Sequence, residues 1–501
     1  MTQLRQPSTV SVESVARPGV ALGVVVVIAC VAQFMTILDE FVVNVALPAM
    51  RGGLRLSTTD QQWVVNAYTI AFGGFLLLAA RAGDLFGRRR VLQAGLVVFT
   101  VASLLGGLAP GAGLLLAARI AQGVGAAALA PASLSLITAS HPEGPARARA
   151  LTVWSAMAGL AAPVGLVLGG VLTAELSWRY VLFVNVPIGV ATMVASMLAL
   201  SPSPRGAERS RLDLPGALSV TAGVGSFVFG VSEAATKGWG SALVLAAMLA
   251  GAALLAVFVR IEGRSPAPLV PLRTFRHRSL TVADAIIACV GVALTAQLFF
   301  VSLYLQQVLA YSALRTGLAM IPMSLAMIAG TVGAKSLLPR FGARRLLVAG
   351  AVLGTAGVAW LSRLPLGSAY ALHILGPTLV LGVGFGAMML PVSEAATAGI
   401  GPRQDGLASG LFNVSRQIGG AIGLAVLVTV AGTVTRHAHL ADPAAATVRG
   451  YRAALLVCAG VTFASAGISL VLPDRAVREE DGRPLGRVQP NHPEPSIPLT
   501  E

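Results

Sequence analysis

"FGRRRVLQAG", residues 86–95, and "FGARRLLVAG", residues 341–350, are two loops that match at seven of ten positions, although 255 residues separate them. Each is a short basic stretch that leads into an apolar run. A weaker match follows at a similar spacing, between "QGVGAAA" from Gln122 and "LGVGFGA" from Leu381. Similarity at a nearly constant spacing indicates an internal duplication, so the chain is expected to contain two related halves.

The composition places both halves in a membrane. Of the 501 residues, 55% are hydrophobic and only 11% are charged, and the mean hydropathy is +0.78, whereas soluble proteins carry roughly 25% charged residues. Apolar runs near the ~20 residues that cross a bilayer recur along the chain, and at such lengths only helices satisfy their own backbone in lipid. We therefore expect an all-α polytopic membrane protein with fourteen spans, at about 21–46, 63–80, 91–109, 113–138, 149–173, 180–200, 215–233, 241–259, 282–308, 316–338, 345–362, 368–392, 406–433 and 452–472.

The duplication determines how these spans are grouped. Because the matching loops precede the third and the eleventh span, spans one to six correspond to spans nine to fourteen, and the seventh and eighth form an inserted pair. Two extra spans preserve orientation, so the repeats are parallel, and a substrate site is expected between them near the midplane. The predicted segments are a cytoplasmic N-terminal tail (1–18), a six-helix bundle (19–200), the inserted pair with its flanking loops (201–279), a second six-helix bundle (280–473) and a disordered cytoplasmic tail (474–501).

The net charge of +15 orients the chain and does not indicate nucleic-acid binding. Most of the 36 Lys and Arg residues fall in tails and loops on the side of the two termini, and such residues concentrate on the cytoplasmic side of membrane proteins. Both termini are therefore expected to be cytoplasmic, without a cleaved signal peptide. Arg outnumbers Lys by 34 to 2, which favours a GC-rich genome and a bacterial plasma membrane.

The sequence contains no constellation typical of an enzyme. The three cysteines fall in separate spans, the six histidines lack metal-binding spacing, and no phosphate-binding loop or nucleophile elbow is present. We expect no metal and no cofactor. The predicted protein is a monomer whose partners are the lipid bilayer, a small lipophilic substrate and protons.

Three charged residues in the first four spans suggest proton coupling. "LDEFVVNVALP", residues 38–48, carries Asp39 and Glu40, and Arg119 lies at a comparable depth in the fourth span. A charge there costs at least ~2.5 kcal/mol unless it is paired or hydrated, so Asp39 and Arg119 are expected to pair, either as a protonation switch or as a purely structural salt bridge. Glu40 points about 100° away from Asp39 and shares a face with Asn44. It is interpreted as a second proton site or a selector for cationic substrates.

The loop after the second span places an acid among basic residues. In "ARAGDLFGRRRVL", residues 80–92, membrane topology explains the arginines but neither the Asp nor the glycines. We interpret the loop as a conformational latch, with topology alone as the alternative. Its expected members are Gly83, Asp84, Gly87, Arg88 and Arg89.

Polar and aromatic residues within the spans predict a substrate cavity. Arg416, near the midplane of the thirteenth span, requires a cavity or a partner; a link between the two halves is the alternative. The ninth span mixes amide and aromatic side chains, which suit a lipophilic ligand but are equally ordinary in a core. Glycine-rich runs read as helix-packing seams. The expected cavity residues are Asn44, Asn66, Gln297, Phe300, Tyr304, Asn413 and Arg416.

These stretches together resemble the major facilitator superfamily, and within it the 14-helix drug:proton antiporters of the EmrB/QacA type, over about residues 20–473. "LDEFVVNVALP" is similar to the first-helix signature, "WVVNAYTIAFGGFLLLAARAGDLFGRRR" to that of the second helix and its loop, and Arg119 with Gln122 and Gly123 to that of the fourth. "LSWRYVLFVNVPIG", "YLQQVLAYSALRTGLAMIPM" and "GLASGLFNVSRQIGGAIG" are also typical of this branch.

The resemblance implies proton-driven efflux of hydrophobic toxic compounds, with Asp39 as the coupling carboxylate and Arg119 as its partner. The fifth helix would carry the antiporter motif, but "AAPVGLVLGG" departs from the family pattern, because its proline stands at Pro163 and Leu166 follows Gly165, before Gly169 and Gly170. The expected function is therefore a proton-coupled exporter of drugs or an antibiotic. The alternatives are a narrow-specificity metabolite exporter, an uptake symporter and, more remotely, a non-transporting membrane sensor or scaffold.

Overall fold

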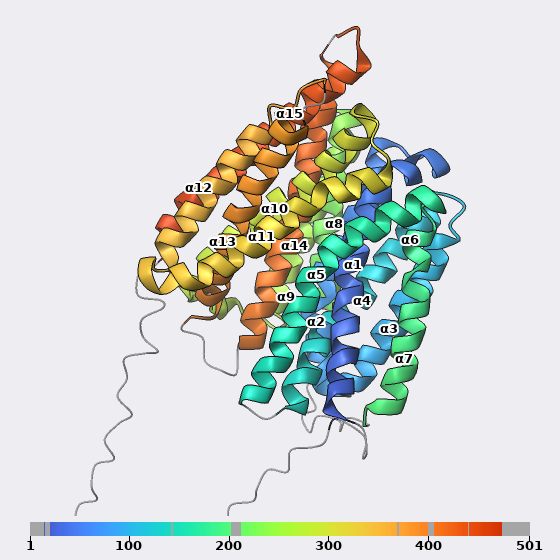
Figure 1. Ribbon diagram of the computed structural model, residues 1–501. Coiled ribbons are helices and arrows are strands. Elements are labelled where there is room, and N and C mark those ends of the chain that lie inside the picture. The colour runs from blue at the N-terminus through green and yellow to red at the C-terminus, as the bar shows by residue number, and fades with distance from the viewer. Residues whose placement is uncertain are drawn as a thin grey trace, which may run out of the picture.

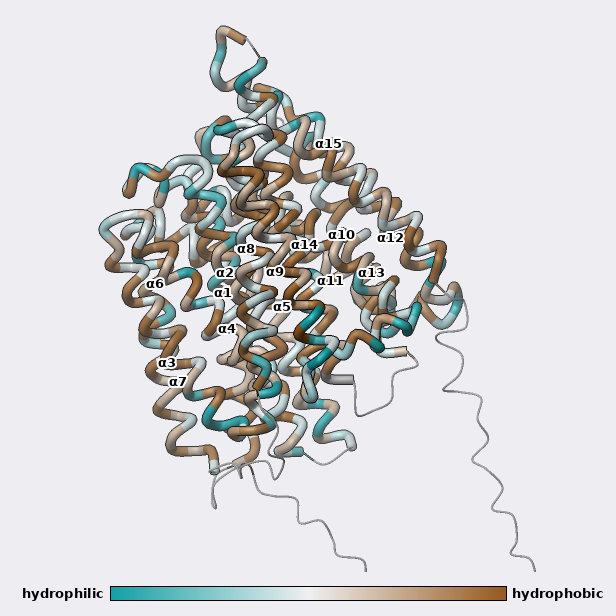
Figure 2. Tube along the Cα trace, turned by 180° about the vertical axis from the view of Figure 1, so that it is seen from behind, coloured by the Kyte–Doolittle hydropathy of each residue, from teal (hydrophilic) through white to brown (hydrophobic). Residues whose placement is uncertain are grey.

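The computed structural model describes residues 15, 21–141, 144–201, 212–367, 370–398, 405–438 and 440–472. Within these residues, fourteen helical segments are long and apolar enough to cross a membrane, and all fourteen predicted spans are confirmed. Hydrophobic residues run along the lengths of the helices, while hydrophilic ones gather at their ends (Figure 2). The chain is thus an all-helical membrane bundle. We call the end of the bundle at which α1 begins the near end, and the end at which α1 finishes the far end.

The first half contains six spans, which are drawn in blue to green in Figure 1. The sixth is broken at Val184 into a short helix and a longer one. The helices are α1 (Leu22–Leu54), α2 (Thr58–Phe86), α3 (Arg88–Gly107), α4 (Ala112–Ser140), α5 (Pro145–Glu175), α6 (Tyr180–Phe183) and α7 (Asn185–Ala199).

Along the sequence, an extra pair of helices follows the first half. A short 3-10 turn and the second set of six spans come after this pair. The helices are α8 (Leu214–Lys237), α9 (Ala242–Glu262), η1 (Leu272–Arg276), α10 (Arg278–Leu303), η2 (Tyr304–Val308), α11 (Ala313–Phe341), α12 (Ala343–Leu361), η3 (Ala371–Leu375), α13 (Gly376–Thr397), α14 (Asp405–Arg436) and α15 (Pro443–Leu470). The segments η2 and η3 are single π-helical turns that extend α10 and precede α13.

The duplication is visible in both backbone and packing. Gly87 ends α2 with φ 94°, and Gly342, 255 residues later, ends α11 with φ 78°. Only glycine adopts such angles without strain, which explains why both loops begin with Phe-Gly. In the first half α4 packs against α2 and α3, and α1 against α5; in the second, α13 packs against α11 and α12, and α10 against α14.

The two halves meet along two lateral seams. At one seam α5 packs against α11, where a Cβ added to Gly317 would lie 2.1 Å from the Leu166 carbonyl oxygen. At the other, α2 packs against α14, and α8 covers both helices. There Gln62 Nε2 of α2 donates to Ser232 Oγ at 3.0 Å, and Thr429 Oγ1 of α14 donates to the Val231 carbonyl oxygen at 2.8 Å. The inserted pair therefore touches both halves.

Hydrogen bonds from α10 and from its π-helical extension η2 to α1 join the halves toward the far end. Ser302 Oγ donates to the Asn44 carbonyl oxygen at 3.1 Å, and Gln306 Nε2 donates to that of Val45 at 3.0 Å. Both acceptors precede Pro48, whose missing N–H leaves the Asn44 carbonyl without its helical donor. We call these two hydrogen bonds the α1–α10 contact.

Candidate functional site

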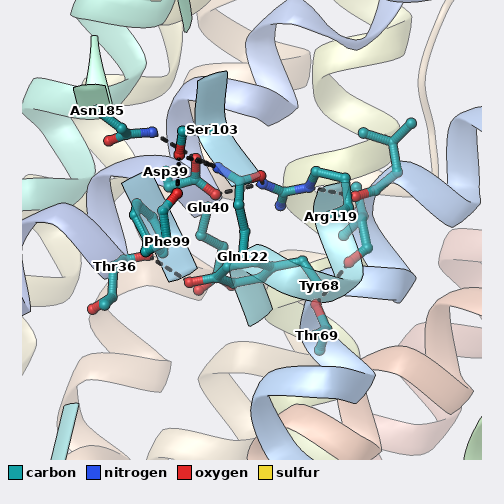
Figure 3. A network of polar contacts seen from close by, with 12 residues as sticks. Thr36, Asp39, Glu40, Tyr68, Thr69, Phe99, Ser103, Arg119, Gln122 and Asn185 are labelled. Atoms are coloured by element: carbon teal, nitrogen blue, oxygen red, sulfur yellow. Dashed lines mark hydrogen bonds and ion pairs between the residues drawn. The ribbon is translucent and has the colours of Figure 1, made fainter. Parts of the chain in front are cut away.

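Asp39 lies at the centre of a buried polar cluster in the first half (Figure 3). The residue is 1% exposed. Its Oδ2 accepts a hydrogen bond from Arg119 Nη1 at 2.5 Å, and its Oδ1 accepts from Gln122 Nε2 at 3.1 Å and from Asn185 Nδ2 at 2.9 Å. The ion pair expected from the matching depths of Asp39 and Arg119 is present. Three donors from two other helices, α4 and α7, therefore bond to this carboxylate.

Arg119 is also 1% exposed, and its remaining contacts explain how a guanidinium is tolerated there. Its Nε donates to the Val64 carbonyl oxygen at 2.9 Å, and Nη1 donates to Gln122 Oε1 at 2.9 Å. The guanidinium carbon lies 4.4 Å from the centre of the Tyr68 ring, a cation–π contact. The charge is thus paired and bonded on several sides, as a buried cation requires.

Close packing of α2, α3 and α4 positions this cluster. A Cβ on Gly123 would lie 2.5 Å from the Tyr68 carbonyl oxygen, so only glycine lets α4 approach α2 so closely. Arg119 and Gln122, three residues apart, share one face of α4. Gln122 Nε2 also donates to Ser103 Oγ of α3 at 2.8 Å. Five helical elements, α1 to α4 and α7, thereby meet at one carboxylate.

Glu40 and Arg416 differ from the residues of the Asp39 cluster in burial and in hydrogen bonding. Both are half-buried, and neither side chain forms a hydrogen bond or an ion pair with any residue that the structure describes. The Glu40 carbonyl oxygen accepts from Asn44 Nδ2 at 2.7 Å, so Asn44 binds the backbone of Glu40 and not its carboxylate. The two adjacent acids of α1 therefore occupy different environments.

The other expected cavity residues fall into two groups. Asn66 and Gln297 are buried, and their amide groups have no hydrogen-bond partner within the described chain. Asn413 is half-buried and donates to the Ser409 carbonyl oxygen at 3.0 Å. The second group consists of the aromatic residues Phe300 and Tyr304.

Phe300 and Tyr304 do not face an open cavity in this conformation. Each is 1% exposed. Phe300 packs against Tyr451 of α15, with ring centres 5.3 Å apart, and the Tyr304 hydroxyl donates to the Pro365 carbonyl oxygen at 2.6 Å. In this conformation both aromatic side chains therefore pack as core residues. Phe300 of α10 and Tyr304 of η2 are turned into the second half.

The sequence profile of the Major Facilitator Superfamily matches residues 29–424. The chain belongs to this superfamily. It is 44% identical over 412 residues to the cephamycin export protein CmcT of Amycolatopsis lactamdurans, covering 82% of this chain and 85% of that protein. It is 40% identical over 481 residues to the puromycin resistance protein pur8 of Streptomyces alboniger, covering 94% and 95%. Both relatives are named for antibiotic export or resistance and not for an enzymatic reaction.

The fold of this major facilitator protein is similar to that of solved transporters. A peptide transporter of the POT type in complex with sulfate aligns with a TM-score of 0.67 at 14% identity, covering 91% of this chain and 95% of that one. Among the residues described here, no group of three or more His, Cys, Asp or Glu side chains is placed to hold a metal ion.

In the loop expected to act as a latch, the carboxylate and the arginines are in different environments. Asp84 is exposed and forms no hydrogen bond or ion pair with the described residues, while the glycine Gly83 is buried. Arg88 Nη1 donates to the Ser135 carbonyl oxygen of α4 and Arg89 Nη2 to that of Met197 in α7, both at 3.3 Å. In this conformation the arginines fasten the near ends of the first-half helices to one another.

The glycines of the expected antiporter motif bring α5 against two other helices. A Cβ on Gly165 would lie 3.1 Å from the Leu38 carbonyl oxygen, and one on Gly169 would lie 2.8 Å from that of Val42. Gly170 faces the other half, where a Cβ would lie 2.7 Å from Leu314 Cα of α11. The motif therefore joins α1 to α5 and α5 to α11, although its proline, Pro163, is shifted within the helix.

Sequence reasoning missed one donor to Asp39, Asn185, and one residue that supports another donor, Ser103. Asn185 begins α7, and Ser103 supports Gln122 from α3. An Asn followed by Val-Pro inside an apolar span was a detectable signal, because an amide in lipid needs a partner. Ser103 gave no signal, since a hydroxyl can bond its own helix, and Ser103 Oγ does donate to the Phe99 carbonyl oxygen at 2.7 Å.

Proposed function

We propose that this chain is a proton-coupled antiporter that exports lipophilic drugs or an antibiotic across a bacterial plasma membrane and thereby confers resistance, with both termini in the cytoplasm. The names of its relatives support the export of antibiotics. The charge distribution supports the orientation, because Lys and Arg concentrate on the side of the termini. In this proposal the near end is cytoplasmic and the far end is external.

The observation that carries the proton coupling is the buried Asp39 cluster. A proton that binds Asp39 neutralises the carboxylate that pairs with Arg119 in the described part of the chain and removes the ion pair. Arg119 then keeps its bonds to Val64 and Gln122 but faces an uncharged acid, so the helices held by the pair are free to separate. Loss of a proton restores the pair. A cluster that changes its bonding with one proton is what coupling requires.

α1 connects this cluster to the contact between the halves. Asn44 lies five residues beyond Asp39, about 8 Å along the helix axis, and its carbonyl oxygen belongs to the α1–α10 contact. Movement of α1 when Asp39 gains a proton from the external side or loses it to the cytoplasm is therefore transmitted to that contact. The α5 glycines pack against the same stretch of α1, so α5 is expected to move together with α1. Breaking the α1–α10 contact is the step that opens the far end in this proposal.

Half-buried Glu40 and Arg416 are proposed to face the substrate path between the halves. Neither is paired within the described chain, so each is available to a ligand. Glu40 is proposed to favour cationic substrates, with Asn66, Gln297 and Asn413 as nearby polar positions. The exposed Asp84 is proposed to re-form the latch when the near end closes.

Inverted membrane vesicles with an acidified lumen test the proposal. Added puromycin should enter the lumen in exchange for protons, so a preformed pH gradient should collapse on its addition. Asp39→Asn should abolish this response, because the side chain no longer takes up a proton. Asp60→Asn is the matched control, since Asp60 is a capping residue at the far end of α2. An uptake symporter would move drug in the opposite direction under the same gradient. Full drug accumulation by Asp39→Asn would disprove the coupling assignment.

A further inference from the structure

Asp284 is a buried acid in the second half that has none of the bonds formed by Asp39. It lies in α10, six residues after Arg278, and is 6% exposed. Both carboxylate oxygens are shielded from solvent, and neither has a hydrogen-bond partner in the described part of the chain. An ionised carboxylate in such surroundings costs several kcal/mol, whereas a protonated acid is uncharged.

No described cation offsets this cost. The elements that pack against α10 are α1, η1, η2, α13, α14 and α15. None of their titratable or charged side chains bonds to Asp284. These groups are Cys30, Asp39, Glu40 and Arg51 of α1, Arg273 and Arg276 of η1, Tyr304 of η2, Glu394 of α13, Arg416 and Arg436 of α14, and Arg449, Tyr451, Arg452 and Cys458 of α15.

The surroundings of Asp284 combine tight packing with an adjacent apolar cavity. One turn further along α10, a Cβ on Gly419 of α14 would lie 2.5 Å from the Ala288 carbonyl oxygen. A cavity of about 510 Å³ begins at Ala288 between α10, α14 and α15, and Ser415 is its one hydroxyl-bearing lining residue. Asp284 thus lies about 9 Å from the near end of α10 and one helical turn before Ala288, where the mostly apolar cavity begins.

From this geometry we infer that Asp284 is a second proton-binding site, located in the second half, and that it holds its proton in the conformation in which Asp39 pairs with Arg119. The proton binds a carboxylate oxygen to give the neutral acid while the far end is open, and leaves as a free proton toward the near end when α10 shifts against α14 and exposes the group. α10 also carries Ser302 of the α1–α10 contact, so its movement is linked to the opening and closing of the far end. The role in transport rests on the proposed antiport; the protonated state of the acid does not.

Infrared spectroscopy of the full chain in lipid nanodiscs tests the protonated state without transport. At neutral pH, the difference spectrum between wild type and Asp284→Asn should contain the carbonyl stretch of a protonated carboxylic acid. Asp39→Asn should retain that band. The amide variant resembles the neutral acid in size and charge, so monodispersity and thermal stability near those of wild type are expected. A difference spectrum with only ionised-carboxylate bands would overturn the inference.

Proteoliposomes test the transport role through the number of protons moved per drug. Asp284→Asn should move one proton fewer per puromycin than wild type, and at a pH difference of one unit its limiting drug gradient should fall about tenfold. Glu233→Gln, a carboxylate in α8 paired with Lys237, is the control and should match wild type. An unchanged ratio in Asp284→Asn would overturn the inference while leaving antiport intact. No proton movement in wild type would instead disprove the antiport, and the infrared result would still decide whether Asp284 binds a proton.

Discussion

Removing either partner of the buried Asp39–Arg119 pair should destabilise the protein by unequal amounts. Asp39→Asn leaves a guanidinium that cannot lose its proton, whereas Arg119→Gln leaves a carboxylate that can gain one. In Asp39→Asn the new amide oxygen can accept from Gln122 and Asn185, as Asp39 Oδ1 does now. Its NH₂ group then faces Arg119, so a donor opposes a donor. We expect a loss of about 3 to 5 kcal/mol, the cost of a buried charge without its partner.

Arg119→Gln should cost less, about 1 to 3 kcal/mol, because protonation of Asp39 removes the buried charge and leaves only unsatisfied hydrogen bonds. Proton uptake by the folded variant makes its stability rise as pH falls, and Asp39→Asn should show no such gain. The double variant Asp39→Asn/Arg119→Gln should be more stable than Asp39→Asn alone, since no charge remains.

Thermal unfolding in detergent across pH 5 to 8 measures these differences. The buried Asp213 provides the matched control, because its carboxylate caps α8 through the Gly216 N–H and has no ion pair within the described chain. Asp213→Asn should cost only about 1 kcal/mol. The reasoning is refuted if Arg119→Gln is the less stable single variant at pH 5, or if the double variant is no more stable than Asp39→Asn.

Three further predictions concern the contact between the halves and the substrate path. Gly317→Ala places a Cβ 2.1 Å from the Leu166 carbonyl oxygen and should slow export by forcing α5 from α11, while Gly333→Ala on the same helix, with open space around it, should export normally. Ser302→Ala removes one hydrogen bond of the α1–α10 contact, worth about 1 kcal/mol; spin-label distances across the far end should show a roughly fivefold larger open population, and an unchanged distribution would contradict this. Glu40→Gln should reduce resistance to cationic drugs while sparing neutral ones in a susceptibility panel, and equal losses for both would remove its role as a selector.

The spans and their grouping were predictable because lipid imposes helices of a set length and the Phe-Gly loops repeat. The pairing of Asp39 with Arg119 was predictable from depth, since two isolated opposite charges in hydrocarbon require each other. Rotation about the helix axes was not predictable. It decides that Phe300 and Tyr304 turn into the second half and that Asn185 reaches Asp39 from α7.

Asp284 was missed for a related reason. A polar residue six positions into a span resembles one that reaches the water at the helix end, and burial comes from the neighbouring helices, which the sequence of α10 does not specify. Depth along a helix was thus readable from the sequence, while direction around it was not.

The α8 helix makes the protein asymmetric toward molecules dissolved in the bilayer. Since α8 covers the line where α2 meets α14, a lipophilic compound diffusing in the membrane meets the extra pair on that side. Neither α8 nor α9 packs against the opposite line, where α5 meets α11. Large apolar side chains of both of these helices are exposed, including Val153 and Leu160 of α5 and Leu325 and Val332 of α11. A compound that enters from the lipid phase between α5 and α11 would not meet the extra pair. Separation of α5 from α11 does not require α2 or α14 to separate from α8.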